Sequence, residues 1–238
     1  MIHKKMLLGI LMCMALIRSV HPQNRYMVHG DVQGLDNEKL MVLKTEGDDF
    51  KIEIISVENN TFQFSGEIAE PFWVQLLLVK NGSDAETEGK LTEFLIEPSE
   101  IYVVGCSKRF SDVKVYGSKA DKVLKMYFKK DEELSEKWLS LKRERDEFLA
   151  QKDSLNAYKI KKQLNAIILE ERVPLLKSYV RENSDNIVGA LLPFFCTLKN
   201  AMTENDYIEI YNLLSEDIQK TGFGRNIKNT ITEYKKKQ

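Results

Sequence analysis

The sequence is poor in the residues from which most catalytic and metal centres are built. Only three cysteines and three histidines occur among its 238 residues. A structural zinc site usually takes about four such ligands in paired spacing, and this chain has no such pattern. A Cys-x-x-Cys pair is also absent, so disulfide exchange through that motif is excluded. The sequence reveals no catalytic, cofactor-binding or metal site.

An excess of charge of one sign is also lacking. The chain has 35 basic and 36 acidic residues, for a formal net charge of -1. Nucleic-acid binding needs a clustered positive surface, so we expect no nucleic-acid partner. The hydrophobic fraction of 43% and charged fraction of 30% are typical of a folded globular protein, long enough for two domains.

The longest apolar run lies at the N-terminus. Lys4 and Lys5 precede an apolar run over residues 6–17, which Arg18 closes. This run is shorter than the roughly 18 residues of a spanning helix and is typical of a secretory signal peptide. We expect a signal peptide at residues 1–22, and therefore an exported protein of the periplasm or cell envelope.

Cys13 leaves a second interpretation of this segment open. As a lipid-accepting cysteine it would make the protein a membrane-attached lipoprotein, and we expect membrane association only in that case. Against lipidation, the bulky Met12 precedes the cysteine, and the apolar run continues to Ile17, where a lipoprotein would turn polar. A plain signal-peptide cysteine is the favoured interpretation.

The next part of the chain consists of short extended runs separated by turn residues. Eight segments have the length and alternation of strands. They are Tyr26–Gly30, Leu40–Leu43, Lys51–Ile55, Thr61–Phe64, Phe72–Val79, Leu91–Ile96, Ile101–Val104 and Val113–Tyr116. No helix-length segment lies between them, which disfavours parallel βαβ units. The pattern predicts an antiparallel β-sandwich or barrel-like domain at residues 24–117.

After Ser118 the composition shifts to Lys, Glu and Leu, and helical periodicity replaces alternation. Leu134, Trp138, Leu141 and Phe148 recur at the spacing of one helix face. Further helices are expected at Ser154–Glu170, Pro174–Val180, Asn186–Leu198, Glu204–Leu214 and Asn226–Glu233. The predicted fold class is α+β by segregation, with the β domain followed by an all-helical region at residues 119–236.

Cys106 and Cys196 are the two cysteines outside the N-terminal segment. In an oxidising compartment they could form a disulfide that ties the sheet to a helix. Two buried free thiols are the favoured interpretation. His21 and His29 could serve Ser-His or Cys-His chemistry, but we interpret both as surface histidines.

Three other patterns have functional interpretations that their spacing weakens. Asp84-x-Glu86-x-Glu88-Gly89 is similar to a calcium loop, but Leu95 stands where the bidentate Glu is needed. Gly222-x-Gly224 lacks the third glycine of a dinucleotide fingerprint and is interpreted as a helix-breaking turn. The acidic pairs Asp48-Asp49 and Glu170-Glu171 give no basis for an acid/base assignment.

Aromatic residues offer two candidate binding surfaces. Phe72, Trp73, Phe94 and Tyr102 could form a ligand platform, and Phe194-Phe195 could form a docking surface. Strands and apolar helices bury aromatic side chains by default, so we expect most of these residues in the core.

A series of glycines, aromatics and turn residues points to a family. It comprises Tyr26-x-Val28-x-Gly30, Gly34-Leu35, Asn60-x-Phe62-x-Phe64-x-Gly66, Pro71, Phe94-Leu-Ile-Glu-Pro98 and Tyr116-Gly-Ser118. In this order and spacing it resembles domain of unknown function 4369. That family typically forms the N-terminal part of exported thiol-disulfide oxidoreductases from Bacteroides-like bacteria, before a helical linker and a thioredoxin-fold domain resembling TlpA and ResA. Residues 182–190 resemble that linker, with Ser184 in place of a proline.

The resemblance implies a fold rather than a reaction. The sequence stops at Gln238, where a complete relative would begin its thioredoxin domain. We therefore expect a non-catalytic cell-envelope binding or accessory module, with no cofactor and a protein or peptide partner, for which a thioredoxin-fold protein is one candidate. One alternative is thiol-disulfide exchange, through Cys106 and Cys196 or with a separate thioredoxin-like partner. Another is a structural envelope subunit that homo-oligomerises through its helices.

Overall fold

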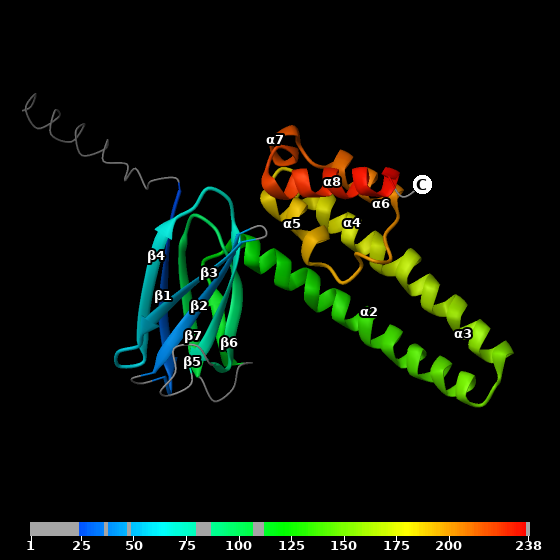
Figure 1. The fold of residues 1–238 in the computed structure, drawn as a ribbon, viewed down its shortest axis with the longest axis horizontal. Helices are drawn as coiled ribbons and strands as arrows, with labels where there is room; N and C mark the ends of the chain where they lie inside the picture. The colour runs from blue at the N-terminus through cyan, green and yellow to red at the C-terminus, as the bar shows by residue number, and fades with distance from the viewer. Residues whose placement is uncertain (1–23, 36–37, 47–48, 80–86, 107–111, 237–238) are drawn as a thin grey trace, which may run out of the picture.

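The computed structural model describes residues 24–35, 38–46, 49–79, 87–106 and 112–236, and shows a β-sandwich followed by a helical region (Figure 1). The strands are β1 (Arg25–Gln33), β2 (Lys39–Glu46), β3 (Asp49–Ser56), β4 (Thr61–Glu67), β5 (Phe72–Val79), β6 (Thr87–Ile96), β7 (Glu100–Cys106) and β8 (Lys114–Tyr116). Each coincides with one of the eight predicted strands. The predicted α+β fold class is confirmed.

The strands form two four-stranded sheets. Sheet A has the order β4-β1-β7-β8, and sheet B has the order β3-β2-β5-β6. Neighbouring strands are antiparallel, with the exception of β1 and β7, which pair in parallel. Local alternation does not report strand direction, so this parallel pair was not predicted from the sequence. The inner faces of both sheets enclose one hydrophobic core.

Two glycine–aromatic pairs on β1 and β4 explain much of the family resemblance. Gly30 lies directly opposite Phe62, and Tyr26 lies directly opposite Gly66. A side chain on Gly30 would overlap the Phe62 ring, and one on Gly66 would contact the Tyr26 ring and hydroxyl. Each ring therefore lies over a strand backbone that only glycine leaves open. These motif residues specify how the sandwich packs.

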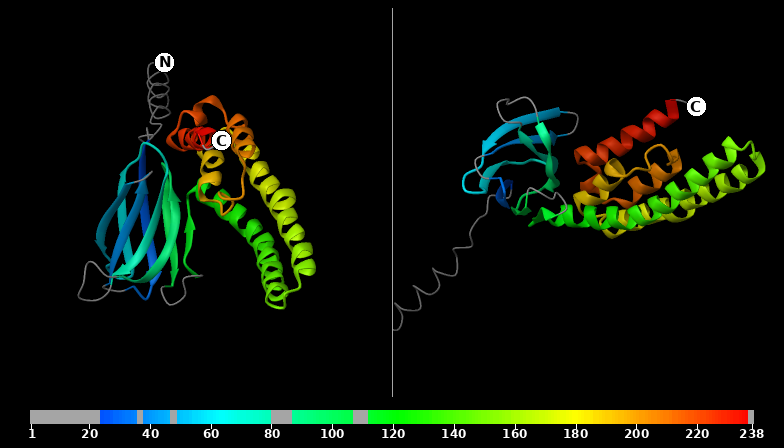
Figure 2. Two further views of the ribbon diagram at one scale, coloured as in Figure 1. Left: turned by 45° about the vertical axis from the view of Figure 1, so that its right-hand side comes forward. Right: turned by 90° about the horizontal axis from the view of Figure 1, so that it is seen from below.

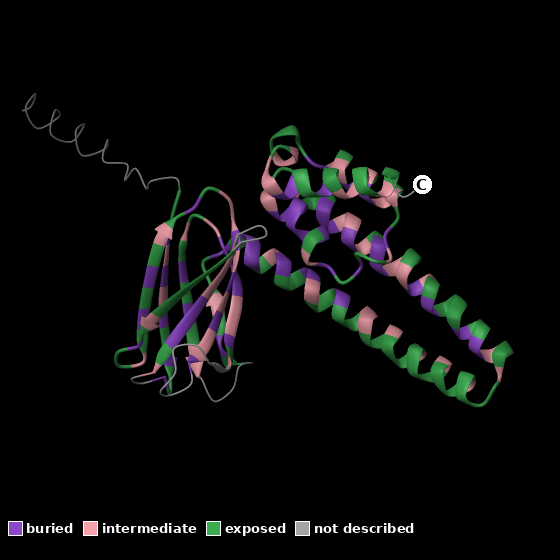
Figure 3. Ribbon diagram, viewed as in Figure 1, coloured by how far each residue is buried: buried purple, intermediate pink, exposed green. Residues whose placement is uncertain are grey.

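The helical region begins directly after β8. Its elements are α2 (Lys119–Ala150), α3 (Ser154–Ala166), the π-helical turn η2 (Ile167–Arg172), α4 (Val173–Glu182), α5 (Ile187–Phe195), α6 (Glu204–Leu213), α7 (Glu216–Gln219) and α8 (Gly222–Lys236). Figures 1 and 2 show α2 and α3 as an antiparallel pair that extends away from the sandwich. Figure 3 shows the outer half of α2 as largely exposed, with the buried positions concentrated nearer the sandwich.

Two sequence interpretations of this region are wrong. Gly222 and Gly224 do not break a helix, because they form the first turn of α8. A side chain on Gly224 would overlap the carbonyl oxygens of Ile218 and Gln219, so glycine is needed there for close approach to the preceding turn. The expected gap before Pro174 is also absent. The chain stays helical through η2, where the Val173 N–H donates to the carbonyl of Ile168.

The start of α2 is fixed to the sandwich by three polar side chains. Ser118 is the N-cap residue, and its hydroxyl accepts from the Asp121 N–H at 3.0 Å. The Glu97 carboxylate, at the end of sheet B, accepts from the Lys119 and Ala120 N–H groups. Asp121 in turn accepts from the Leu95 N–H of β6 at 3.0 Å. The first turn of α2 is therefore hydrogen-bonded to the edge of sheet B.

A buried ion pair joins α2 to η2 inside the helical core. The Arg172 guanidinium donates to both carboxylate oxygens of Asp131, at 2.7 and 2.6 Å, and to the Thr197 hydroxyl at 2.6 Å. Arg172 and Asp131 are both buried. Such a pair is costly to break from one side, because the remaining charge stays away from water.

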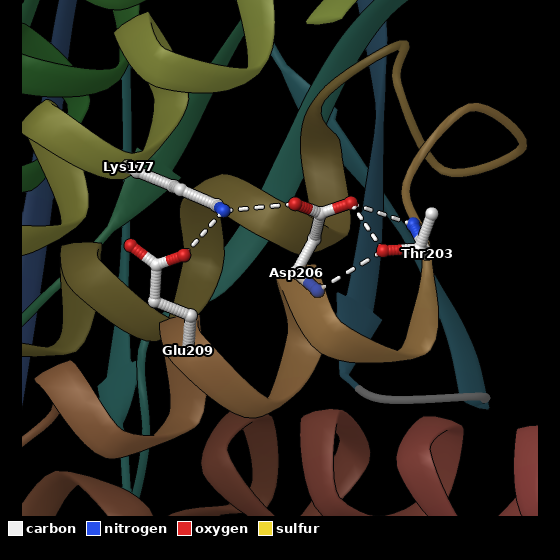
Figure 4. A network of polar contacts seen from close by, with 4 residues as sticks. All are labelled: Lys177, Thr203, Asp206 and Glu209. Carbon is white, nitrogen blue, oxygen red and sulfur yellow. Dashed lines mark hydrogen bonds and ion pairs between the residues drawn. The ribbon is translucent and has the colours of Figure 1, made fainter.

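A second, more exposed network joins α4 to α6. Lys177 contacts Asp206 and Glu209 at 2.8 and 2.5 Å, and Asp206 also completes the capping box with Thr203 (Figure 4). Partial burial disfavours the charge on Asp206, but the Lys177 ammonium and the hydrogen bonds from Thr203 outweigh that effect and lower its pKa. Thr203 and Asp206 thus form a capping box at the start of α6.

Replacing Arg172 by Met should destabilise the protein strongly. We expect the free energy of unfolding to fall by about 3–5 kcal/mol, because Asp131 would keep a buried charge without its cation. The matched control is Glu171→Gln, one residue away, which breaks the exposed Lys137–Glu171 pair and should cost less than about 1 kcal/mol. Urea denaturation of both variants measures the two values. Similar small losses in both would contradict the role of the buried pair.

Candidate functional site

A cleft of about 980 Å³ lies between the sandwich and α8. Its walls come from the end of β4, the turn into β5, the start of β3, and the first two turns of α8. We call it the interdomain cleft. The lining residues are Asn24, Lys51, Glu67, Ile68, Ala69, Glu70, Pro71, Phe72, Gly222, Phe223, Arg225, Asn226, Lys228 and Asn229. Its volume is in the range of ligand-binding pockets.

The cleft has an apolar floor and a polar rim. Ile68, Phe72 and Phe223 are buried beneath it, and each belongs to one of the two hydrophobic cores. Three cations, three side-chain amides and two carboxylates lie among the lining residues. Each asparagine amide offers both donors and an acceptor, as a peptide backbone does. The arrangement combines an apolar surface with hydrogen-bonding groups of both kinds.

Glu70 closes one end of the cleft by capping α8. Both of its carboxylate oxygens accept from the Gly222 N–H, at 2.9 and 2.8 Å. A negative charge is favoured at this position, because the N–H groups of the first helical turn point outward. A side chain on Gly222 would contact the Glu70 carboxylate, so the glycine permits this link between turn and helix.

The positive side chains of the cleft outnumber its carboxylates. Arg225, Lys228 and Lys51 are positive, whereas Glu67 and Glu70 are negative. Arg225 donates to the carbonyl of Lys220, which holds its guanidinium at the rim. The cleft therefore favours a ligand that carries at least one negative group.

The aromatic residues proposed as a platform are not brought together. Phe72 and Phe94 are buried on the inner face of sheet B, and Trp73 lies on its outer face, with ring centroids 5.1 Å from Phe195. Tyr102 lies on sheet A, where it stacks on His29 at 5.3 Å. Because Tyr102 and His29 face one another, neither ring offers that face to a ligand.

Phe194 and Phe195 have separate surroundings. Phe195 packs against Trp73 of the sandwich, and Phe194 is partly exposed and contacts Phe223 edge to face at 5.7 Å. The pair therefore joins the two domains in addition to presenting one exposed ring. Both rings adjoin the cleft floor, because Phe72 is next to Trp73 in the chain and Phe223 contacts Phe194.

Cys106 and Cys196 are both free thiols in the structure. Cys106 is partly buried at the end of β7, and Cys196 is buried directly after α5. Burial raises the pKa of the Cys196 thiol to about 11. Its thiolate, the reactive form, is therefore scarce at neutral pH. Cys13 and the expected signal peptide lie outside the described residues.

The remaining candidate residues do not gather into a site. His29 is partly buried on sheet A, and Glu171 pairs with Lys137. His21, Asp48, Asp84 and Glu86 lie outside the described residues. Where the structure describes the chain, no group of three or more His, Cys, Asp or Glu side chains is arranged to hold a metal ion. In the same residues, no helix has both the length and the apolar character to cross a membrane.

Sequence reasoning missed the interdomain cleft entirely. Glu70 and Gly222, which meet at its end, are 152 positions apart in the chain. Asn226 and Asn229 are ordinary residues on the exposed side of a helix. The one available signal was Gly222. We interpreted this glycine as a helix breaker, whereas it begins α8 and its N–H donates to Glu70.

Comparison with known proteins gives a family match for the sandwich but no activity. No curated protein matches the chain. A solved structure, the cytotoxin protein suilysin from Streptococcus suis, is similar at 8% identity with a TM-score of 0.22, over 40% of this chain and 23% of that one. The family model described as Domain of unknown function (DUF4369) matches residues 26–124. This confirms the resemblance inferred from the motif residues: the match covers the sandwich and the first turns of α2.

Proposed function

We propose that this protein is a non-catalytic binding module of the cell envelope, and that its interdomain cleft holds an extended segment of a partner polypeptide. The observation that carries the proposal is the cleft itself, with its apolar floor, its three asparagines and its excess of positive charge. An extended peptide offers alternating N–H and C=O groups to the amides. Its apolar side chains would cover Phe72 and Phe223, and an acidic side chain would pair with Arg225 or Lys228.

Two further features support a binding role over catalysis. Among the residues that the structure describes, no cysteine, histidine or tyrosine lines the cleft, and the Glu70 carboxylate is engaged by the Gly222 N–H. A general base or nucleophile must reach the reacting atoms. Among the described lining residues, Glu67 is the one remaining carboxylate that could take such a role. The N-terminal signal-like segment supports placement in the periplasm or cell envelope.

The alternative of thiol-disulfide exchange has weaker support. Exchange needs an accessible thiolate and a neighbouring thiol that resolves the mixed disulfide. Cys196 is buried with a raised pKa, and its Sγ donates to the Pro193 carbonyl. Neither Cys106 nor Cys196 lines the cleft.

Peptide binding should depend on the cations of the cleft. Short random peptides displayed on phage would be selected on the immobilised protein, and enriched peptides measured by fluorescence anisotropy. We expect acidic peptides whose affinity falls at least about tenfold in the Arg225→Glu/Lys228→Glu variant, since each charge pair is reversed. Because Arg225→Glu also removes the hydrogen bond to the Lys220 carbonyl, circular dichroism and a thermal melt check that the variant is folded.

The matched control is Lys235→Glu/Lys236→Glu, which makes the same change of charge at the other end of α8. It should leave affinity within about twofold. Failure to enrich any peptide, or equal loss in both variants, would contradict a peptide site in the cleft.

Thiol reactivity separates binding from thiol-disulfide exchange. In a Cys13→Ser chain we expect one thiol, Cys106, to react with a chromogenic disulfide reagent in the native state. Cys196 should react after denaturation, because its pKa is raised and its side chain is buried. Adding Cys106→Ser should abolish the native reaction. Rapid reaction of both thiols, with loss of both on mild oxidation, would instead favour the exchange alternative.

A further inference from the structure

The two edges of sheet B are treated differently. The β6 edge is covered by α2, because Asp121 accepts from the Leu95 N–H. At the other edge, β3 pairs with β2 in an unbroken register of eight residues, and no other described strand pairs with it. β3 contains no proline, glycine or bulge that would discourage a further strand. The outward backbone groups of β3 are thus available to another strand.

The outer face of β3 is apolar up to that edge. Phe50, Ile52 and Ile54 point to the same side and are 67%, 63% and 37% exposed. The edge strand of sheet A, β4, instead has the polar residues Thr61, Gln63 and Ser65 at its exposed positions. An apolar edge strand of this length is usually covered by another chain or element.

We propose that β3 pairs antiparallel with the β3 strand of a second copy of this chain, with Ile52 opposite Ile52 on a two-fold axis. This register places Phe50 opposite Ile54 of the second copy, so the apolar residues of both chains meet on one face. It also places Lys51 opposite Glu53 of the second copy, twice by symmetry. Cross-strand pairs of both kinds stabilise antiparallel sheets.

Other registers of the two β3 strands lose the apolar pairs or the lysine–glutamate pairs. A shift of one residue would put the outer face of one copy beside the inner face of the other, which a continuous sheet does not allow. Centring the pair on Lys51 would put two lysines opposite each other. Centring it on Glu53 would remove both lysine–glutamate pairs. The complementarity therefore selects one register.

The charged residues of β2 and β3 within one copy also favour pairing with a second β3 strand. Lys44 on β2 is directly opposite Lys51 on β3, and like charges in that position oppose pairing. Glu53 contacts Lys44 at 2.8 Å. Glu53 of the second copy would place a second carboxylate directly opposite Lys51. The resulting dimer would have one continuous eight-stranded sheet.

Sedimentation equilibrium of the purified chain tests this inference. We expect the mass to rise with concentration from that of a 27.6 kDa monomer towards twice that value. Lys51→Glu alone and Glu53→Lys alone should each abolish the rise, because each puts like charges opposite each other. An equal mixture of the two variants should restore it, since every cross-strand pair is then of opposite charge.

The mixture is decisive because changes within one copy cannot be rescued by a second copy. Circular dichroism checks that each variant is folded. A monomer at every concentration, a dimer that both variants retain, or a mixture that stays monomeric would overturn the proposal. The second outcome would place self-association elsewhere.

A disulfide test locates the axis independently of charge. In a Cys13→Ser/Cys106→Ser chain, Ile52→Cys should form an intermolecular disulfide on mild oxidation, since residues opposite on antiparallel strands are within disulfide reach. Gln63→Cys, on the exposed face of β4, is the matched control and should cross-link much less. Equal cross-linking of both would contradict the register.

Discussion

The placement of the helical region depends on one junction, the first turn of α2. Four N–H groups at a helix start have no partner within the helix. Here Ser118 and Glu97 accept from three of them, and Asp121 returns the contact by accepting from the Leu95 N–H of β6. Helix and sheet edge therefore satisfy each other's backbone groups, and α2 can leave the sheet in one direction only.

The chemistry of Asp121 makes this junction specific. Asp121 is 2% exposed, and burial raises its pKa, although the ion pair with Lys125 and the Leu95 N–H both favour the charged form. A hydrophobic residue could fill the same space but would leave the Leu95 N–H without an acceptor, which is expensive in a buried position. Leu95 itself points into the helical core. The backbone of one residue thus fixes the junction while its side chain joins the two domains.

What the sequence predicted well is local, and what it missed is not. Alternation identified all eight strands because each buried position follows from its own neighbours, as in β4, where Phe62 and Phe64 are buried between exposed residues. The parallel pairing of β1 with β7 depends on the path of the whole chain. The interdomain cleft lies where Glu70 meets Gly222. It forms because α2 directs the helical region back towards the sandwich, and local sequence does not report that direction. The family resemblance could be predicted because its glycines and aromatics, such as Gly30 and Phe62, pack directly against each other.

A ligand of the cleft would act on the other contact between the domains, the one between Glu70 and α8. Glu70 is held between two anchors, the buried Ile68 and Phe72, and its carboxylate reaches the N-terminus of α8. An acidic group on a ligand would be attracted to the same N–H groups and to Arg225, so it would compete with Glu70 for α8. Competition of this kind links ligand occupancy to the contact between the domains. Because α2 is fixed at Asp121, the freedom gained would lie at the α8 side of the cleft, where the sandwich is joined to the helices by Glu70, Trp73 and Phe195.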